Sequence, residues 1–323
     1  MRPQPLLDLL KSVENQTFYP DEILIIDGSI NGQTSKLFKE NKFKNCKYYL
    51  VDANFRGLTK QRNFGIEKTN IESEIIAFVD DDTVLNTDYF EQLIKTFEFN
   101  KEFTGVGGVA VNENTWTKIN PNVKYNKYRY ETFEGYAFKE GQRNVVRNFL
   151  GLQSNLGAGK MPDFSHGKTC GFPLTDKIYE VDLLIGMSFA FRKIVFENIK
   201  FSPYFEGYGL YEDADFSIRA LQFGKNVINT KLQLQHFHDL SGRPNKYKYG
   251  KMVVRNGWYV WRVKNVKPSS NSTFKWHLIT LLLILIRFTN ILTTNEKKAA
   301  LTESLGRTFG WLSLIFSKPK MQN

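Results

Sequence analysis

This chain has little cysteine and no signal-peptide pattern. Its two cysteines, Cys46 and Cys170, are too few for a disulfide framework, and their separation is not that of a metal-ligand pair. A reducing, cytoplasmic compartment fits this usage. Residues 1–16, MRPQPLLDLLKSVENQ, lack the long apolar core of a signal peptide.

The chain also has no run of five or more basic residues, although its formal net charge is +11 and its isoelectric point about 9.4. No zinc-finger spacing and no RNA-binding signature occurs, so we expect no nucleic-acid partner. The positive balance favours a nucleotide or an anionic membrane surface instead. With 323 residues, 41% of them hydrophobic, the chain can form one large domain, or a domain with an extension.

No apolar run is long and uninterrupted enough for a clear membrane span. The most apolar segment, residues 277–292 (HLITLLLILIRFTNIL), is broken by Arg287. Together with residues 306–316 (GRTFGWLSLIF), this segment is typical of a helical anchor at a membrane surface. A pair of ordinary buried helices is the alternative.

Strand and helix patterns alternate through the first third of the chain. Helices are predicted at residues 6–16, 34–40, 58–68 (with Thr59 as a cap) and 88–99, and strands at 22–27, 47–53, 74–80 and 105–111. Such alternation is typical of a parallel sheet with crossover helices, so we predict an α/β fold. The pattern is lost from 112 to about 182 and resumes near Ile185.

Three consecutive carboxylates follow the strand predicted at residues 74–80. Asp80, Asp81 and Asp82 stand where a parallel strand would end, which is where open α/β sheets bind ligands. Clustered acid beside a buried strand is costly unless a cation lies there, so a metal ion with a phosphate ligand is favoured. A solvated turn near a helix start is the alternative.

Other polar residues are expected at the same edge of the sheet. Asp27 ends an earlier strand and can accept hydrogen bonds from a base or ribose, unless it only closes a turn. Arg56, Lys60 and Arg62, in residues 54–65, offer cations for a diphosphate. A solvated helix face is the alternative.

A second acid pair and two histidines come later in the chain. Glu212 and Asp213 stand where a helix begins, as a general base or as simple helix caps. His236 and His238 share one strand face with two leucines, Leu232 and Leu234. Imidazole suits manganese, so either histidine can complete a site begun by the aspartates, or be a satisfied hydrogen-bonding group near the core.

The order of these motifs resembles the family 2 glycosyltransferases, which are inverting enzymes with a GT-A type, Rossmann-like, mostly parallel sheet. The resemblance covers residues 2–262 and rests on DGS, NFRG with QRNFG, VDDD, GMSFAFRK, YEDADFSIRALQFG and HFHD. It implies a nucleotide-sugar donor (a UDP-, GDP- or dTDP-sugar) and a divalent metal, Mn²⁺ or Mg²⁺.

The same resemblance implies roles for single residues. On the donor side, Asp27 would contact the nucleobase, while Asp80 and Asp82 would be the first and last acids of the metal-binding Asp-x-Asp motif, with Asp81 between them. On the acceptor side, the roles fall to residues further along the chain: Asp213 as catalytic base, Glu212 in support of the acceptor site, and His236 or His238 as the contact to metal or phosphate.

We therefore expect a metal-dependent glycosyltransferase of the hexosyltransferase type. Its acceptor would be a glycan or a lipid-linked precursor of a surface polysaccharide, and its location the cytoplasmic membrane face. Three parts are predicted: a nucleotide-sugar-binding half at 1–111, an acceptor-binding and catalytic half at 112–262, and a helical tail at 263–323. A non-catalytic nucleotide-sugar-binding or scaffold protein is a competing hypothesis. A glycoside hydrolase would explain the paired acids but not the α/β start or the late histidines.

One departure from the family pattern concerns the first strand. Family members begin with a strand ahead of the first helix, whereas here Met1, Arg2 and Pro3 already lead into that helix. That strand would lie beside the one carrying Asp80, so we expect open strand edges in its place. A misplaced start codon or a truncated gene is our hypothesis for the difference.

Overall fold

The chain folds into two compact units, each made of two separate stretches of sequence. The computed structural model describes residues 2–169, 171–238 and 244–321, so Cys170 and the Asp239 of HFHD lie outside the described residues. Unit 1 is Met1–Asn114 with Thr169–Ser241, and unit 2 is Thr115–Lys168 with Gly242–Asn323. The units therefore follow other boundaries than the three functional parts expected from the sequence, and the functional division itself stays a prediction.

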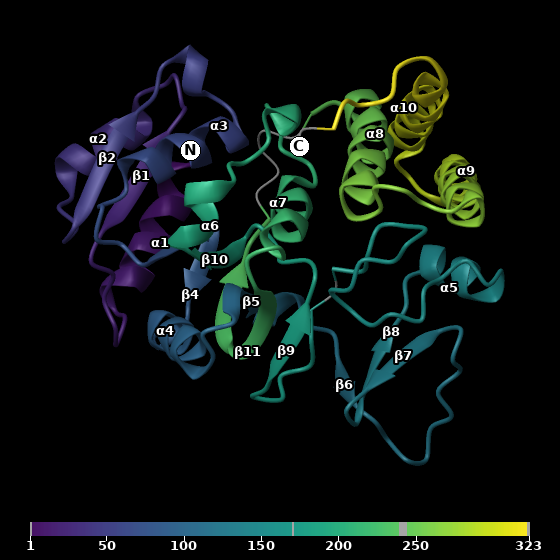
Figure 1. The fold of residues 1–323 in the computed structure, drawn as a ribbon, viewed down its shortest axis with the longest axis horizontal. Coiled ribbons are helices and arrows are strands. Elements are labelled where there is room, and N and C mark those ends of the chain that lie inside the picture. The colour runs from purple at the N-terminus through teal and green to yellow at the C-terminus, as the bar shows by residue number, and fades with distance from the viewer. Residues whose placement is uncertain (1, 170, 239–243, 322–323) are drawn as a thin grey trace. The chain divides into compact units, whose positions relative to one another are not determined.

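The first half of unit 1 has the predicted alternation of helices and strands (Figure 1). α3 begins and ends where predicted, although Thr59 lies inside it and the helix follows Gly57. The strand predicted at 47–53 ends early, because Ala53–Phe55 forms a 3-10 turn. The elements are α1 (Pro3–Glu14), β1 (Ile23–Asp27), α2 (Gln33–Glu40), β2 (Cys46–Leu50), α3 (Leu58–Lys68), β3 (Ile75–Val79), β4 (Thr83–Leu85), α4 (Tyr89–Phe99) and β5 (Phe103–Ala110).

The second half of unit 1 completes a six-stranded mixed sheet. It adds β9 (Ile178–Val181), β10 (Ser188–Arg192), α6 (Lys193–Asn198), α7 (Glu212–Ala220) and β11 (Lys225–His236). The strand order is β3-β10-β5-β11-β4, with β9 also paired to β11. β5 and β11 run parallel, whereas β10, β4 and β9 are antiparallel to their neighbours. The predicted α/β fold is confirmed.

The expected open strand edges are present. Among the strands of the described residues, β1 pairs in parallel with β2 alone and β3 pairs with β10 alone. β1 and β2 therefore form a sheet of their own, and Ala77 in the middle of β3 is exposed. An edge strand offers unpaired backbone N–H and C=O groups along its length.

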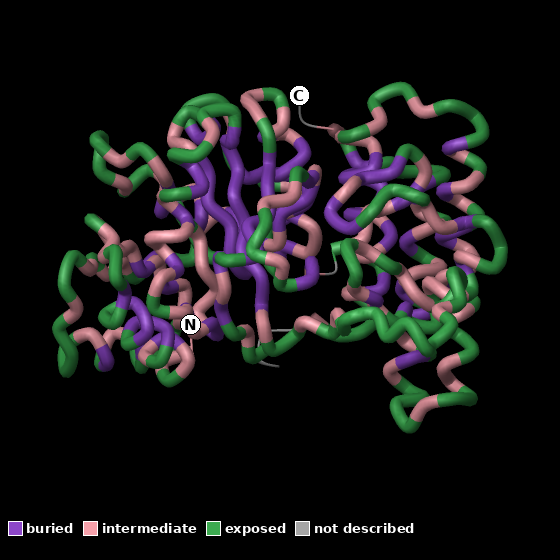
Figure 2. The backbone as a smooth tube through the Cα atoms, turned by 90° about the horizontal axis from the view of Figure 1, so that it is seen from below, coloured by how far each residue is buried: buried purple, intermediate pink, exposed green. Residues whose placement is uncertain are grey.

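The core of unit 1 lies between the large sheet and the helices α1 and α4. Leu6, Leu9 and Leu10 of α1, which contacts β4, are almost fully buried, as are Leu93 and Phe97 of α4, which contacts β11 and β5. Figure 2 shows this buried backbone as a continuous region along the strands. The helical spacing of these residues on each helix explains why one face of each is apolar.

Unit 2 contains a small antiparallel sheet and four helices. The sheet has the order β6-β8-β7, from β6 (Thr117–Lys118), β7 (Tyr130–Phe133) and β8 (Tyr136–Lys139). It lies in the stretch for which the sequence showed no pattern, because its strands are only two to four residues long. The helices are α5 (Gln142–Phe149), α8 (Lys246–Lys264), α9 (Ser270–Thr293) and α10 (Lys297–Phe316).

Glycines let α8 and α10 pack with their backbones in contact. A Cβ atom at Gly306 would lie 2.1 Å from the Tyr247 carbonyl oxygen, and one at Gly250 would lie 2.2 Å from the Glu303 carbonyl oxygen. Real Cβ atoms do not approach backbone so closely, so any larger residue must push the helices apart.

We predict that Gly306→Ala destabilises unit 2, although alanine favours helix by about 1 kcal/mol. The overpacking should cost about 1–3 kcal/mol and lower the melting temperature by several degrees. All five tryptophans lie in unit 2, so tryptophan fluorescence reports on it selectively. Leu305→Ala, at the exposed neighbouring position, is the control and should change little. An unchanged or higher melting temperature for Gly306→Ala would contradict the packing.

Candidate active site

The three consecutive aspartates form a tight turn between β3 and β4. The Asp80 N–H donates to the Met187 carbonyl oxygen at 3.0 Å, and the Thr83 hydroxyl donates to the Asp80 carbonyl oxygen at 2.8 Å. The turn reverses the chain into β4, which is the edge strand next to β11. The acids therefore lie at the carboxyl end of β3, as predicted.

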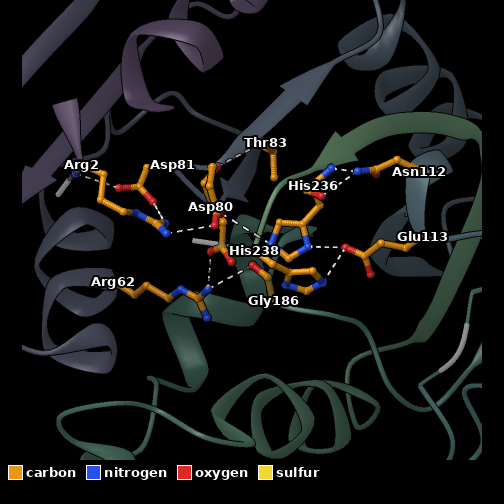
Figure 3. A network of polar contacts seen from close by, with 11 residues as sticks. Arg2, Arg62, Asp80, Asp81, Thr83, Asn112, Glu113, Gly186, His236 and His238 are labelled. Carbon is orange, nitrogen blue, oxygen red and sulfur yellow. Dashed lines mark hydrogen bonds and ion pairs between the residues drawn. The ribbon is translucent and has the colours of Figure 1, made fainter. Parts of the chain in front are cut away.

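The pairing of β4 with β11 brings His236 to these acids. His236 is the register partner of Thr83, and its Nε2 lies 3.5 Å from Asp82 Oδ1 (Figure 3). One ligand atom each from Asp80, Asp82 and His236 lie within 4.8 Å of one another. Of the two candidate histidines, His236 is the one that joins the aspartates.

His238 belongs to a second group, centred on Glu113. Glu113 Oε1 lies 2.7 Å from His236 Nδ1 and 2.9 Å from His238 Nε2. The His238 side chain is 57% exposed, and its backbone φ of 47° is unusual for a non-glycine residue. Glu113, His236 and His238 form a group of their own that could hold a cation, and the predicted role of His238 toward metal or phosphate stays a prediction.

Asn112 and Glu113 are functional candidates that the sequence analysis missed. Asn112 holds the His236 backbone through two hydrogen bonds, donating to the carbonyl oxygen at 2.7 Å and accepting from the N–H at 3.0 Å. Both residues directly follow β5, which runs parallel to β11. Because parallel strands end at the same edge of a sheet, their position after β5 was the available signal.

Cationic side chains already surround the acid turn. Arg2 donates from Nη1 to Asp82 Oδ2 at 3.0 Å, and its guanidinium also pairs with Asp81. Arg62 Nη2 lies 3.7 Å from Asp80 Oδ1. These pairs offset part of the repulsion among the three carboxylates.

Burial and neighbouring charges shift the pKa values of two side chains at the turn. Burial raises the pKa of Asp80 to about 6, with Asp82 and Asp81 acting in the same direction and Arg62 and His236 opposing it. Burial lowers the pKa of His236, but Asp82 and Glu113 outweigh it and hold that pKa above its usual value. Burial is thus the main cause of the shift at Asp80, and the neighbouring carboxylates are the cause at His236.

Arg62 lies under this turn and connects it to α7. Its guanidinium pairs with Glu212 and donates from Nη2 to the Gly186 carbonyl oxygen at 3.1 Å. It also lies 4.8 Å from the Phe189 ring centroid, with two further phenylalanine rings beside it, and its side chain is 8% exposed. The buried position makes Arg62 a link between the two acid clusters, and its predicted contact with a diphosphate stays untested.

The two acids at the start of α7 differ in exposure and in partners. Glu212 is buried, and burial raises its pKa to about 8, with Arg62 opposing this and Asp213 adding to it. Asp213 is half-buried, and its carboxylate accepts hydrogen bonds from the Gly186 N–H at 3.0 Å and the Ala214 N–H at 2.8 Å. The preceding Tyr211 has a left-handed backbone, with φ of 70°, which adds local strain.

The remaining predicted site residues lie at the end of β1 and around the start of α3. Asp27 is fully buried, and its carboxylate accepts from Ser29 N–H at 2.8 Å and from the Tyr48 hydroxyl at 2.8 Å. Lys60 pairs with Glu206 at 3.2 Å, and Arg56 is exposed. Their roles toward a donor stay predictions.

The donor set at the acid turn fits a divalent cation. Asp80 and Asp82 offer hard oxygen atoms and His236 adds an imidazole nitrogen, a combination that suits Mn²⁺. A cation bound there would stabilise the charged form of Asp80, whose pKa burial raises.

We predict that Arg62→Met destabilises unit 1 by about 1–3 kcal/mol, because the buried Glu212 carboxyl would then lose its hydrogen-bond partner. Replacing both partners, in Arg62→Met/Glu212→Met, should recover much of this loss. Hydrogen exchange in unit 1 peptides during denaturant titration measures the change.

The matched control is Lys200→Met, which breaks the exposed Lys200–Glu67 pair and should change stability little. A single Arg62→Met variant as stable as the native protein would contradict the link.

Comparison with known proteins bears on the family and the fold. Residues 1–154 match the family model described as glycosyl transferase family 2. A protein of Bacillus subtilis (strain 168) named glycosyltransferase EpsH is 24% identical over 318 residues, which are 97% of this chain and 79% of that protein.

Two solved structures share the fold. GalNAc-T7, crystallised with UDP, GalNAc and Mn²⁺, superposes with a TM-score of 0.51 at 16% identity, over 77% of this chain. This chain spans 45% of that protein's length. The mannosyltransferase PcManGT of Pyrobaculum calidifontis, in complex with GDP-Man and Mn²⁺, superposes with a TM-score of 0.50 at 12% identity, over 99% of this chain and 73% of that one.

The motif order, the mixed α/β sheet and these matches lead to one assignment. Residues 1–154 of this chain match glycosyl transferase family 2, and the chain has a GT-A type fold.

Proposed function

We propose that this glycosyltransferase moves a hexose from a nucleotide-sugar donor to a hydroxyl of a glycan or lipid-linked acceptor, with inversion at the anomeric carbon. A UDP-, GDP- or dTDP-sugar is the proposed donor, and surface polysaccharide synthesis at the cytoplasmic membrane face the proposed setting. The observation that carries the proposal is the link from Asp80 through Arg62 to the Glu212–Asp213 pair. This link connects the proposed cation site with the proposed catalytic base, and both lie in unit 1.

The donor side of the site is the acid turn. Asp80, Asp82 and His236 would hold a divalent metal, which supplies charge neutralisation for the departing nucleoside diphosphate. Arg2 pairs with Asp81 and Asp82, so its guanidinium adds positive charge at the same edge. Arg56 and Lys60 are proposed to contact the donor phosphates from the start of α3. Asp27 is proposed to contact the nucleobase, which requires Ser29 or Tyr48 to release its carboxylate.

The acceptor side is the start of α7. We assign Asp213 as the base, because it is the half-exposed member of the acid pair and backbone N–H groups from Gly186 and Ala214 fix its carboxylate. Each carboxylate oxygen keeps a second lone pair that can take the proton of the acceptor hydroxyl. Glu212 is buried against Arg62, so its proposed part is to hold Arg62 and the start of α7 in place.

These proposed roles lead to inversion of configuration at the anomeric carbon. A base on one side of the sugar and a stabilised leaving group on the other require a single displacement. No side chain has to form a covalent bond to the sugar. The same arrangement is consistent with a metal requirement, since the leaving diphosphate is highly charged.

We predict that Asp213→Asn lowers sugar transfer by about 10²–10⁴-fold, because general base catalysis is lost. Donor binding should stay nearly unchanged. Thermal shift with UDP-, GDP- and dTDP-sugars plus Mn²⁺ identifies the donor, and nucleotide release with a glycan or lipid acceptor measures transfer.

Asp88→Asn, on the half-exposed residue before α4, is the control for a lost aspartate charge and should transfer normally. Normal transfer by Asp213→Asn would move the base to another residue. A β-configured product from an α-linked donor, seen by NMR, tests inversion.

The competing function is donor binding without turnover, and one observation favours it. β1, which carries Asp27, forms a sheet separate from the one that carries the acid turn. A donor pocket formed by residues of both sheets would then have no strand-to-strand hydrogen bonds between its two sides. Saturable donor binding with no nucleotide release, with any acceptor tested, would support this alternative.

A further inference from the structure

The positive charge of this chain is concentrated in its last quarter. Residues 242–323 contain 15 Lys or Arg and two Asp or Glu, a net charge of +13. The whole chain has +11, so residues 1–241 are close to neutral, at −2. Such an asymmetry indicates an anionic partner for the α8–α10 region rather than for the whole molecule.

α9 carries an apolar stripe on its outer face. Phe274, Leu278, Leu285, Phe288 and Leu292 are all exposed, from 39% to 85%. At 100° per residue they fall within a narrow sector that runs the length of the helix. Among the described residues α9 alone is long and apolar enough to cross a membrane, yet only 22% of its apolar window is buried.

In α10 the usual arrangement of a surface helix, with an apolar inner face and a polar outer face, is reversed. Its inner face is mostly small or polar, with Ala300, Glu303, Ser304, Gly306 and Gly310 buried together with one leucine, Leu314. Its outer face carries exposed apolar side chains, from Leu301 and Leu305 through Phe309 and Leu312 to Ile315 and Phe316. An apolar outer face is costly in water, so it indicates a partner that covers it.

Exposed lysines are frequent on the same helices and in the segments that join them. Nine lysines of this region are exposed: Lys246, Lys248, Lys251, Lys264, Lys267, Lys297, Lys298, Lys318 and Lys320. Lys246, Lys297 and Lys298 line one hollow at the start of α10. At the other end of α10, Lys318 is close enough to His277 of α9 to lower its pKa, after burial as the main cause. Exposed apolar side chains together with lysines complement a surface of acyl chains beneath anionic headgroups.

We propose that the outer faces of α9 and α10, defined by the exposed apolar residues named above, dock on a membrane rich in anionic lipid. α9 lies in the plane of the surface and does not cross it. Arg287, in the last third of α9, pairs with the buried Glu303 of α10 at 2.9 Å, and Glu303 is also held by Arg307. A crossing helix would have to break this pair and carry an arginine into the apolar interior.

The test is flotation of the full chain with vesicles, and it needs no sugar transfer. We expect the protein to float with phosphatidylcholine vesicles that contain phosphatidylglycerol, to bind pure phosphatidylcholine much less, and to bind less as salt rises. Leu285→Ser/Phe288→Ser/Leu292→Ser should weaken binding at least about tenfold. Lys297→Gln/Lys298→Gln should weaken it only on anionic vesicles.

Two matched variants in unit 1 control for general effects. Ile30→Ser/Ile71→Ser/Phe99→Ser removes three equally exposed apolar side chains, and Lys36→Gln/Lys39→Gln removes two exposed lysines. Both should bind vesicles normally. Donor binding by thermal shift should be unchanged in the α9 variant, which separates this proposal from the proposed transfer activity.

Three outcomes would overturn the proposal. One is equal binding by the α9 variant and the native chain. Another is resistance of the bound native protein to alkaline carbonate, which would indicate that α9 crosses the bilayer. The third is a native dimer that the α9 variant converts to monomer, without vesicle binding by either, which would assign the apolar faces to a second copy of the chain.

Discussion

The repulsion among Asp80, Asp81 and Asp82 is the constraint on which the site depends. Three carboxylates at the end of one strand can stay together only if cations approach from several directions. Arg2 supplies one from the start of α1 and Arg62 one from α3, and His236 brings an imidazole from β11 to within 3.5 Å of Asp82. Side chains from elements far apart in the sequence thus meet at this one turn. Asp80, Asp82 and His236 each offer a ligand atom within 4.8 Å of the others, which is the arrangement a divalent metal could use for further charge neutralisation.

Local sequence was enough to predict the elements that carry the chemistry. The strand before the acids, the helix at residues 58–68 and the helix start at Glu212 were all predicted, because hydrophobic spacing and strand-ending acids are local signals. His236 could be placed toward the acids, since it shares a strand face with buried leucines. The α/β fold followed from the same alternation.

Contacts between distant residues were beyond the reach of sequence patterns. Arg62 looked like an exposed cation for phosphate, yet it lies among three phenylalanine rings and holds Glu212, which only the packing of α3 on β10 and α7 determines. Glu113 lies in a segment whose sequence shows no helix or strand periodicity, so no local pattern marked it as a site residue. The sheet at 117–139 has strands too short to show alternation, and the split between β1–β2 and the larger sheet is a matter of pairing rather than of local preference.

The central claim is that Asp80, Asp82 and His236 form one divalent cation site, and Mn²⁺ titration followed by EPR tests it most directly. The native chain should bind one Mn²⁺ at this site, while Asp82→Asn and His236→Ala should each weaken binding by about tenfold or more. Asp88→Asn should bind as the native chain does. Equal Mn²⁺ affinity in the native chain and in Asp82→Asn would contradict the account.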